Sequence, residues 1–119
     1  MAQHNELGKK GEQLATDFLL KKDYVILEKN YRYLKAEVDI IAQKKNLLCV
    51  IEVKTRSSVY FGKPEEFVNP KKIKLLLSAI DNYVVERDLD VEVRFDIIAI
   101  ITNKKETKIE HIKDAFLHF

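Results

Sequence analysis

Apolar positions recur at helical spacing in two parts of the chain. Between about residues 5 and 22 they fall on one face of a helix that Asn5 could cap. The members of this stripe are Leu7, Gly11, Leu14, Ala15, Phe18 and Leu19. A second helix is expected to start after the cap residue Asn69 with Pro70 at its first position, and to end near Arg87 and Asp88. Its apolar stripe consists of Ile73, Leu76, Leu77, Ile80 and Val84.

The other apolar runs are short and rich in β-branched residues, which predicts strands. We expect them at 24–34, 36–42, 47–54, 91–101 and 107–116. The first run has an irregularity near Lys29 and Asn30, a turn lies at 43–46, and the stretch 55–67 is typical of a loop because it contains Ser, Gly and Pro. The predicted order is one helix, three strands, a second helix and two strands.

This order constrains how the strands are connected. A full helix separates the third strand from the fourth, so these two should pair in parallel through a right-handed crossover, within an otherwise antiparallel sheet. The predicted fold class is α/β, a central mixed sheet flanked by helices. A chain of 119 residues with 46% hydrophobic content suits a single domain over residues 1–119.

Charge interrupts the second and third strands, in the sequence EVDIIAQKKNLLCVIEVKTR at 37–56. Alternate side chains of a strand share a face, so two wholly apolar sets should face a helix. These sets are Val38, Ile40 and Ala42, and Cys49, Ile51 and Val53. Asp39, Glu52 and Lys54 then lie together on the other face. A two-residue turn at Lys44 and Lys45 would put Asp39 opposite Val50 and diagonal to Glu52, with the register open by one residue pair.

Two carboxylates brought this close repel each other and call for a cation. Lys54 can provide part of the positive charge, and Mg²⁺ prefers oxygen ligands of this kind. The combination fits metal-assisted phosphodiester hydrolysis, with Lys54 orienting water and offsetting developing charge. The alternative is a structural ion pair on a solvated sheet face. Asp96 is expected to support the fold or to pair with Arg94 rather than to bind metal.

Basic residues at three places are candidates for nucleic-acid contacts. Thr55 and Arg56 leave the third strand ahead of the aromatic residues Tyr60 and Phe61, and Arg32 lies between two tyrosines. Lys71 and Lys72 begin the second helix, where the helix dipole disfavours lysine and attracts phosphate. The alternative for each is ordinary solvated surface. The formal net charge is only +2, so any phosphate-binding surface must be local.

Composition excludes several other classes of protein. A single cysteine, Cys49, rules out an internal disulfide and a cysteine-rich zinc site, and its apolar neighbours predict a buried thiol. His4, His111 and His118 are far apart in sequence and are expected to be exposed or capping. The start of the chain lacks the apolar region of a signal peptide, and no apolar run approaches the ~20 residues that span a bilayer. We therefore expect a soluble, cytoplasmic protein with no membrane partner.

Several of these residues carry a resemblance. Asp39, followed after twelve residues by Glu52, Val53 and Lys54, resembles the D…(D/E)xK signature of the restriction-endonuclease-like superfamily. GKKGEQLA at 8–15, NYRYLKAEVDII at 30–41, VIEVKTR at 50–56, FGKPEE at 61–66 and RFDIIAI at 94–100 are similar to the bacterial YraN-like uncharacterised family. The superfamily core, αβββαβ, matches the order predicted above. Ala36 stands where such proteins commonly have glycine, so a turn that needs positive φ would be strained there.

The resemblance implies a Mg²⁺- or Mn²⁺-dependent endonuclease acting on DNA, with branched or structured forms among the expected substrates. Asp39, Glu52 and the Val53 carbonyl would bind metal, and Lys54 would orient water. Glu12 matches an additional glutamate on the first helix of archaeal Holliday-junction resolvases and would assist through metal or water. Those resolvases cut junctions in pairs, which implies a homodimer.

Two other functions remain open. The chain could be a catalytically silent nucleic-acid-binding or adaptor module that depends on a protein partner, as its small size and modest net charge suggest. It could also be an interaction protein that involves no nucleic acid, which predicts no salt-dependent DNA binding.

Overall fold

The computed structural model describes residues 6–58 and 69–115. Its elements are α1 (Glu6–Lys21), β1 (Val25–Tyr33), β2 (Ala36–Lys44), β3 (Leu47–Arg56), α2 (Pro70–Glu86), β4 (Glu92–Thr102) and β5 (Thr107–Ile112). This order confirms the prediction. The proposed cap Asn5 and the aromatic residues Tyr60 and Phe61 lie outside the described residues. No described helix has the length and apolar character needed to cross a membrane.

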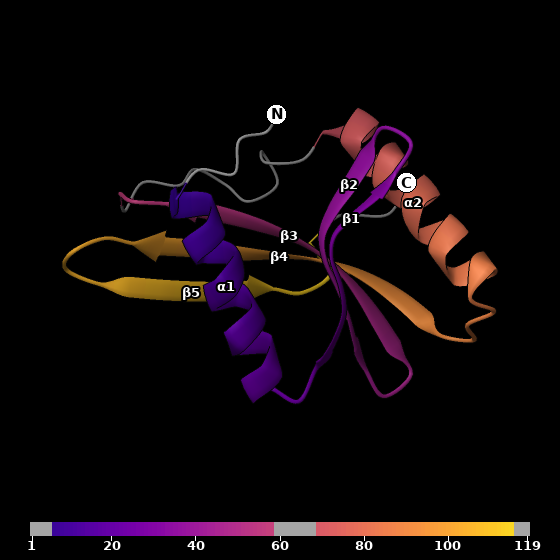
Figure 1. The fold of residues 1–119 in the computed structure, drawn as a ribbon, viewed down its shortest axis with the longest axis horizontal. Helices are drawn as coiled ribbons and strands as arrows, with labels where there is room; N and C mark the ends of the chain where they lie inside the picture. The colour runs from indigo at the N-terminus through magenta and orange to yellow at the C-terminus, as the bar shows by residue number, and fades with distance from the viewer. Residues whose placement is uncertain (1–5, 59–68, 116–119) are drawn as a thin grey trace.

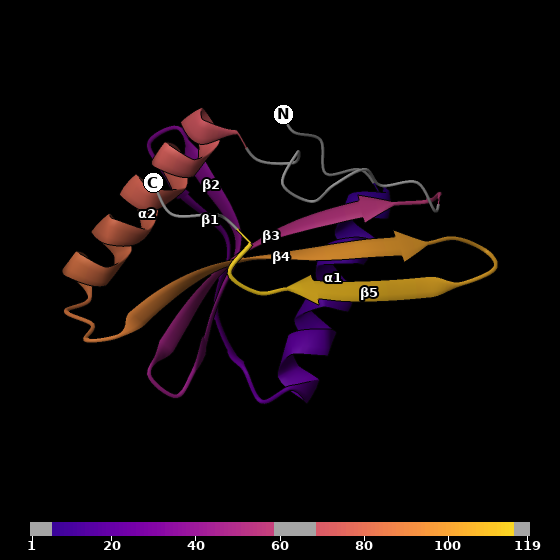
Figure 2. The same ribbon diagram turned by 180° about the vertical axis from the view of Figure 1, so that it is seen from behind.

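The five strands form one mixed sheet in the order β1-β2-β3-β4-β5. β3 and β4 pair in parallel, as expected from the helix between them, and the other neighbours pair antiparallel. The two helices pack on opposite faces: α1 crosses the half of the sheet that contains β5, and α2 lies beside the β1–β2 hairpin (Figures 1 and 2). The irregularity in β1 consists of a register shift between Ile26 and Glu28 and a positive φ of 55° at Asn30.

Each face of the sheet carries an apolar cluster against which one helix packs. The cluster on the α1 side joins Ala15 and Leu19 of the helix and Tyr24 to sheet residues Ile40, Ala42, Cys49, Ile51, Ile98 and Ile100. The sheet residues on the α2 side are Ile41, Leu48, Val50, Ile97 and also Val38. The prediction that Val38 shares a face with Ile40 and Ala42 is therefore wrong. The change of face along β2 falls at Asp39, between Val38 and Ile40.

Helix α2 begins as the sequence predicted. The Asn69 side chain accepts a hydrogen bond from the Lys72 backbone N–H at 2.8 Å, Pro70 is the first helical residue, and Arg87 follows the last. Leu77 is a correction, because it is 39% exposed. It lies about 100° around the helix from Leu76, outside the buried stripe. Ala79 and Tyr83 occupy the buried positions with Ile73, Leu76 and Ile80.

The turn between β2 and β3 differs from the expected one by one residue. Lys44 pairs with Leu47, so the turn residues are Lys45 and Asn46, and Lys45 takes a positive φ of 55°. As a result Val50 pairs with Ile41 and not with Asp39. The paired register ends at Ile40 and Ile51. Continued by one residue, it places Asp39 directly across from Glu52, closer than the diagonal arrangement that was predicted.

Candidate active site

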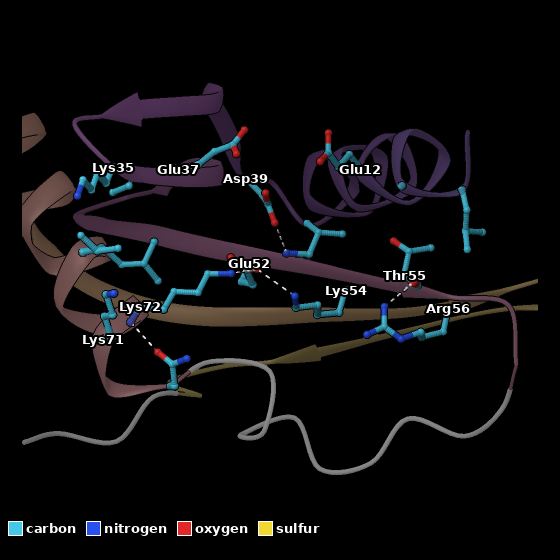
Figure 3. A pocket seen from close by; sticks show the side chains of 17 residues that line it. Glu12, Lys35, Glu37, Asp39, Glu52, Lys54, Thr55, Arg56, Lys71 and Lys72 are labelled. Carbon is cyan, nitrogen blue, oxygen red and sulfur yellow. Dashed lines mark hydrogen bonds and ion pairs between the residues drawn. The ribbon is translucent and has the colours of Figure 1, made fainter. Parts of the chain in front are cut away.

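A cleft of about 640 Å³ opens where the start of α1, the end of β3 and the start of α2 come together (Figure 3). Its walls include every residue proposed as catalytic, metal-binding or nucleic-acid-binding except Arg32. These residues are Glu12, Asp39, Glu52, Val53, Lys54, Thr55, Arg56, Lys71 and Lys72. Arg32 is not a wall residue. Its exposed guanidinium lies 3.5 Å from Glu37, a cleft residue whose charge it offsets.

Asp39 is held by the strand across from it. Its Oδ2 accepts a hydrogen bond from the Val53 backbone N–H at 2.8 Å, beyond the last backbone pair of β2 and β3. Burial, followed by the negative charge of Glu52, raises the pKa of Asp39 to about 7. The charge of Glu12 acts in the same direction, whereas the Val53 hydrogen bond and the charge of Lys72 oppose it. The pKa of Asp39 is therefore raised chiefly by its removal from water, with the nearby acids adding to the rise.

Glu52 is the most enclosed acid of the cleft, with its side chain 7% exposed. Two ammonium groups approach the same oxygen, Oε2: Lys72 Nζ at 2.6 Å and Lys54 Nζ at 3.5 Å. Lys54 comes from β3 itself, as predicted. Lys72 reaches Glu52 from the first turn of α2, a contact that the sequence analysis missed. The disfavoured placement of a lysine at the positive end of a helix was the one signal that it needs an acidic partner.

Glu12 is brought to the cleft by a close approach of α1 to β3. A side chain at Gly11 would overlap the Thr55 side chain, so glycine lets the helix lie directly on the strand. The Thr16 hydroxyl donates to the Glu12 carbonyl at 2.8 Å in the same part of the helix. Close packing of α1 on β3 therefore accounts for the glycine at position 11. Thr55 has a packing role here besides its place in the cleft wall.

The remaining basic residues lie on the rim. Arg56 and Lys71 are both exposed cleft residues. Lys35 is a further wall residue that the sequence analysis did not single out. It follows Leu34, which has a positive φ of 55°, whereas Ala36 does not have positive φ. The departure from glycine at Ala36 therefore introduces no backbone strain before Asp39.

The donor atoms of the cleft can be tested against a divalent cation. Asp39 and Glu52 offer carboxylate oxygens, and the Val53 carbonyl points toward β2 with its own N–H, since both groups of a strand residue face the same neighbour. Among the described residues, no group of three or more His, Cys, Asp and Glu side chains is placed to hold a metal ion. Mg²⁺ in proteins usually takes one or two carboxylates and completes its shell with waters and a substrate phosphate, and two carboxylates are what Asp39 and Glu52 offer. Glu12 is not part of a ready-made ligand set.

A second acidic centre lies under α1, away from the cleft. Asp96 is fully buried and pairs with Arg94, as expected. His111 Nε2 lies 2.8 Å from the same carboxylate and its side chain is 7% exposed, so the expectation of an exposed or capping histidine is wrong for His111. Cys49 is buried nearby, as predicted, with its Sγ 3.5 Å from Arg94. Neither Asp96 nor Arg94 is a cleft residue.

Comparison with known proteins gives a consistent result along the whole chain. The family model described as uncharacterised protein family UPF0102 matches residues 11–100. A UPF0102 protein of Christiangramia forsetii is 65% identical over 119 residues, with 100% of both chains covered. A UPF0102 protein of Flavobacterium psychrophilum is 60% identical over the same span, also covering 100% of both chains. A UPF0102 protein of Phocaeicola vulgatus is 46% identical over 116 residues, or 98% of this chain and 96% of that protein.

Proposed function

Since the chain belongs to the uncharacterised protein family UPF0102, its reaction has to be inferred from its own site, and we propose a Mg²⁺- or Mn²⁺-dependent endonuclease that hydrolyses phosphodiester bonds in DNA. One observation carries the proposal. Asp39 and Glu52 face each other across two strands, in a cleft to which Lys54 and Lys72 also contribute amino groups. The resemblance of Asp39, Glu52, Val53 and Lys54 to the D…(D/E)xK signature supports the same reaction.

Asp39, Glu52 and the Val53 carbonyl would hold the metal. The Val53 N–H fixes the orientation of the Asp39 carboxylate, so this acid needs no rearrangement to face Glu52. A bound Mg²⁺ would polarise the phosphate and make water a better nucleophile at neutral pH. The protein's own residues then position the reactants around the phosphorus.

Lys54 and Glu12 have complementary roles in this proposal. The Lys54 ammonium lies beside Glu52 and would orient the attacking water and offset the charge that develops on the phosphate oxygens. Glu12 stands on the opposite wall, close enough to Asp39 for its charge to act on the Asp39 pKa. It would receive the proton that the water loses as the new phosphorus–oxygen bond forms and the bond to the leaving oxygen breaks.

The basic residues on the rim of the cleft favour a nucleic acid as the substrate. Arg56, Lys71 and Lys35 are cleft residues with basic side chains and would contact backbone phosphates on either side of the scissile bond. Because one cleft makes one cut, we propose a homodimer for paired cutting of branched or structured DNA, in line with the resolvase resemblance.

One observation favours a second candidate, a catalytically silent nucleic-acid-binding or adaptor module that works with a protein partner. Lys72 at 2.6 Å and Lys54 at 3.5 Å already neutralise Glu52 without a metal. A site whose buried acid is satisfied in this way could persist for binding alone.

Cleavage of a labelled DNA panel tests the proposal. The panel contains duplex, single-stranded, flapped and four-way-junction DNA, each incubated with Mg²⁺ or Mn²⁺ and with the natural protein, Glu52→Ala or Lys54→Ala. Each substitution is expected to lower the cleavage rate by about 10²-fold or more, because it removes charge stabilisation at the phosphate. Glu110→Ala removes an exposed carboxylate of β5 outside the cleft and serves as the matched control.

The outcomes separate the two candidates. Cutting that disappears in Glu52→Ala and Lys54→Ala but persists in Glu110→Ala supports the nuclease. Salt-dependent DNA binding with no cutting by the natural protein favours the silent module. Cutting that survives in Glu52→Ala would mean that this cleft is not the site of hydrolysis.

A further inference from the structure

We propose that Lys72 stands in for the divalent cation in the metal-free protein and transfers to a nucleic-acid phosphate when a metal binds, so that metal loading and nucleic-acid binding are coupled. The inference rests on the proposed function and gives it a further positioning residue, outside the D…(D/E)xK signature. In this proposal Lys72 exchanges between Glu52 and a phosphate, whereas Lys54 stays beside Glu52.

Geometry distinguishes the two lysines. Lys72 Nζ is 2.6 Å from Glu52 Oε2, whereas Lys54 Nζ is 3.5 Å from the same atom. The Glu52 side chain is 7% exposed and that of Lys72 is 35% exposed. The acid is therefore enclosed, while the lysine reaches it from the solvent side on a flexible four-carbon stem. Lys72 is also the more exposed of the two partners, since the Lys54 side chain is 25% exposed, and it has the easier path into solvent.

The start of α2 explains why Lys72 would move toward phosphate. Its backbone N–H is fixed by the Asn69 cap at 2.8 Å, so only the side chain needs to change position. The first turn of α2 has no acidic residue to balance Lys71 and Lys72 against the positive end of the helix dipole. Glu52 supplies that balance from β3. Once Glu52 is occupied by another cation, a phosphate becomes the natural partner for both lysines.

A metal bound to Glu52 and the Lys72 ammonium would share one carboxylate. Mg²⁺ binds carboxylate oxygens at about 2.0–2.1 Å, and an ammonium group held on the same carboxylate would be repelled at such close range. Metal binding to Asp39 and Glu52 therefore has to displace Lys72 from the position in which the structure shows it.

Coupling between the two ligands follows by linkage. A phosphate that accepts Lys72 removes the competitor from Glu52 and strengthens metal binding, so a bound metal must strengthen nucleic-acid binding by the same factor. The protein would then hold metal weakly until nucleic acid is present.

Calorimetric titration with Mn²⁺ alone measures the competition directly. Lys72→Gln keeps a hydrogen-bond donor for Glu52 but removes the charge, and we expect it to bind Mn²⁺ roughly tenfold more tightly than the natural protein, as expected when one charge-assisted contact no longer has to be broken. Lys71→Gln removes the same charge from the same helical turn without a contact to Glu52 and should change Mn²⁺ affinity much less. Lys72→Arg restores a cation and should return the affinity toward that of the natural protein.

A second measurement tests the transfer to phosphate. Binding of a labelled DNA duplex is followed by fluorescence anisotropy with and without Ca²⁺. This hard cation also takes oxygen ligands, and it replaces Mg²⁺ so that binding is measured without cleavage. Ca²⁺ should strengthen binding by the natural protein and by Lys71→Gln, and this strengthening should be lost in Lys72→Gln. Thermal unfolding of each variant in the absence of metal identifies any change that comes from the fold alone.

Failure of the inference differs from failure of the proposed function. If the natural protein binds Mn²⁺ and cuts DNA, but Lys72→Gln matches Lys71→Gln in both titrations, the inference is overturned and the nuclease stands. If neither the natural protein nor Lys72→Gln binds Mn²⁺, the metal site itself is overturned, and the inference falls with it.

Discussion

Asp96 on β4 and Asp39 on β2 are acids of the same sheet, but they differ in the groups that surround their carboxylates. Asp96 is fully buried and receives hydrogen bonds from Arg94 Nε and Nη2 at 2.9 Å each, from His111 Nε2 at 2.8 Å and from the Asp114 backbone N–H at 3.0 Å. Asp39 is half-buried, and within the described residues the Val53 N–H provides its one hydrogen bond. Its strongest electrostatic neighbour is another acid, Glu52.

The two pKa values express this difference. Burial alone would raise the pKa of Asp96, but the hydrogen bonds from His111, Arg94 and Asp114 bring it below its ordinary value. Burial and Glu52 instead raise the pKa of Asp39 to about 7. A buried acid that several donors stabilise in its charged form is typical of a structural network, whereas a buried acid beside other acids is a candidate functional group. The contrast is the physical reason to look for function at Asp39 and not at Asp96.

Asp96→Asn should give the largest effect on stability. The substitution leaves the partly buried Arg94 guanidinium beside a neutral group, and breaking a pair whose acid is fully buried costs up to about 3–5 kcal/mol. Urea unfolding of metal-free protein at neutral pH measures the loss. Asp81→Asn, an exposed position on α2, is the matched control and should stay within about 0.5 kcal/mol of the natural protein. Equal stability of the two variants would show that the Asp96 network does not hold the sheet together.

The same comparison has a defined pH dependence. Because the folded pKa of Asp96 is lowered, its contribution is present above the unfolded value of about 3.9 and is lost as the pH falls through the lower folded value. The stability difference between the natural protein and Asp96→Asn should therefore be constant near neutrality and shrink in acid. A difference that grows on acidification would contradict the direction of the shift.

Asp39→Asn should act in the opposite direction, by a smaller amount. The amide oxygen can still accept from the Val53 N–H, while the repulsion with Glu52 and the cost of burying charge disappear. We expect the metal-free variant to gain about 1–2 kcal/mol above pH 7. A raised folded pKa means that the natural protein loses stability as the pH rises from about 4 to about 7, so the gain should vanish near pH 4. Unfolding in a chelator at both pH values tests this, and destabilisation at pH 8 would contradict it.

Local pattern was sufficient to predict the elements and the parallel pair. The helical stripes, the Asn69-Pro70 start and the helix between β3 and β4 are short-range signals, and the structure confirms them except for Leu77 in the second stripe. The convergence of Asp39, Glu52 and Lys54 in one cleft was also predicted from a single hairpin, although the strand alternation behind that prediction fails at Val38. These predictions needed only neighbours in sequence.

The wrong or missing predictions concern features that depend on tertiary contacts. The turn carries no glycine, so nothing local fixed its register, and the structure shifts it to Lys45 and Asn46. The change of face between Val38 and Ile40 depends on two helices packing on opposite sides of the sheet. Lys72 on Glu52 and His111 on Asp96 join side chains from different elements. Residue spacing carries no information about such pairs, because each depends on where a later element docks.

The reactivity of the Cys49 thiol can report small differences in stability, because this thiol lies beside Arg94 in the buried centre around Asp96. Burial raises the pKa of Cys49 to about 11, so on the order of one thiol in a thousand is ionised at pH 8 even when a reagent can reach it. Alkylation by iodoacetamide should therefore proceed only through opening of the fold, slowly in the natural protein. Because the opening population follows stability, the reaction should accelerate in Asp96→Asn and slow further in Asp39→Asn. If all three proteins react at the rate seen in denaturant, the centre around Asp96 is open in solution, and the distinction between a satisfied acid and a poised one would not hold.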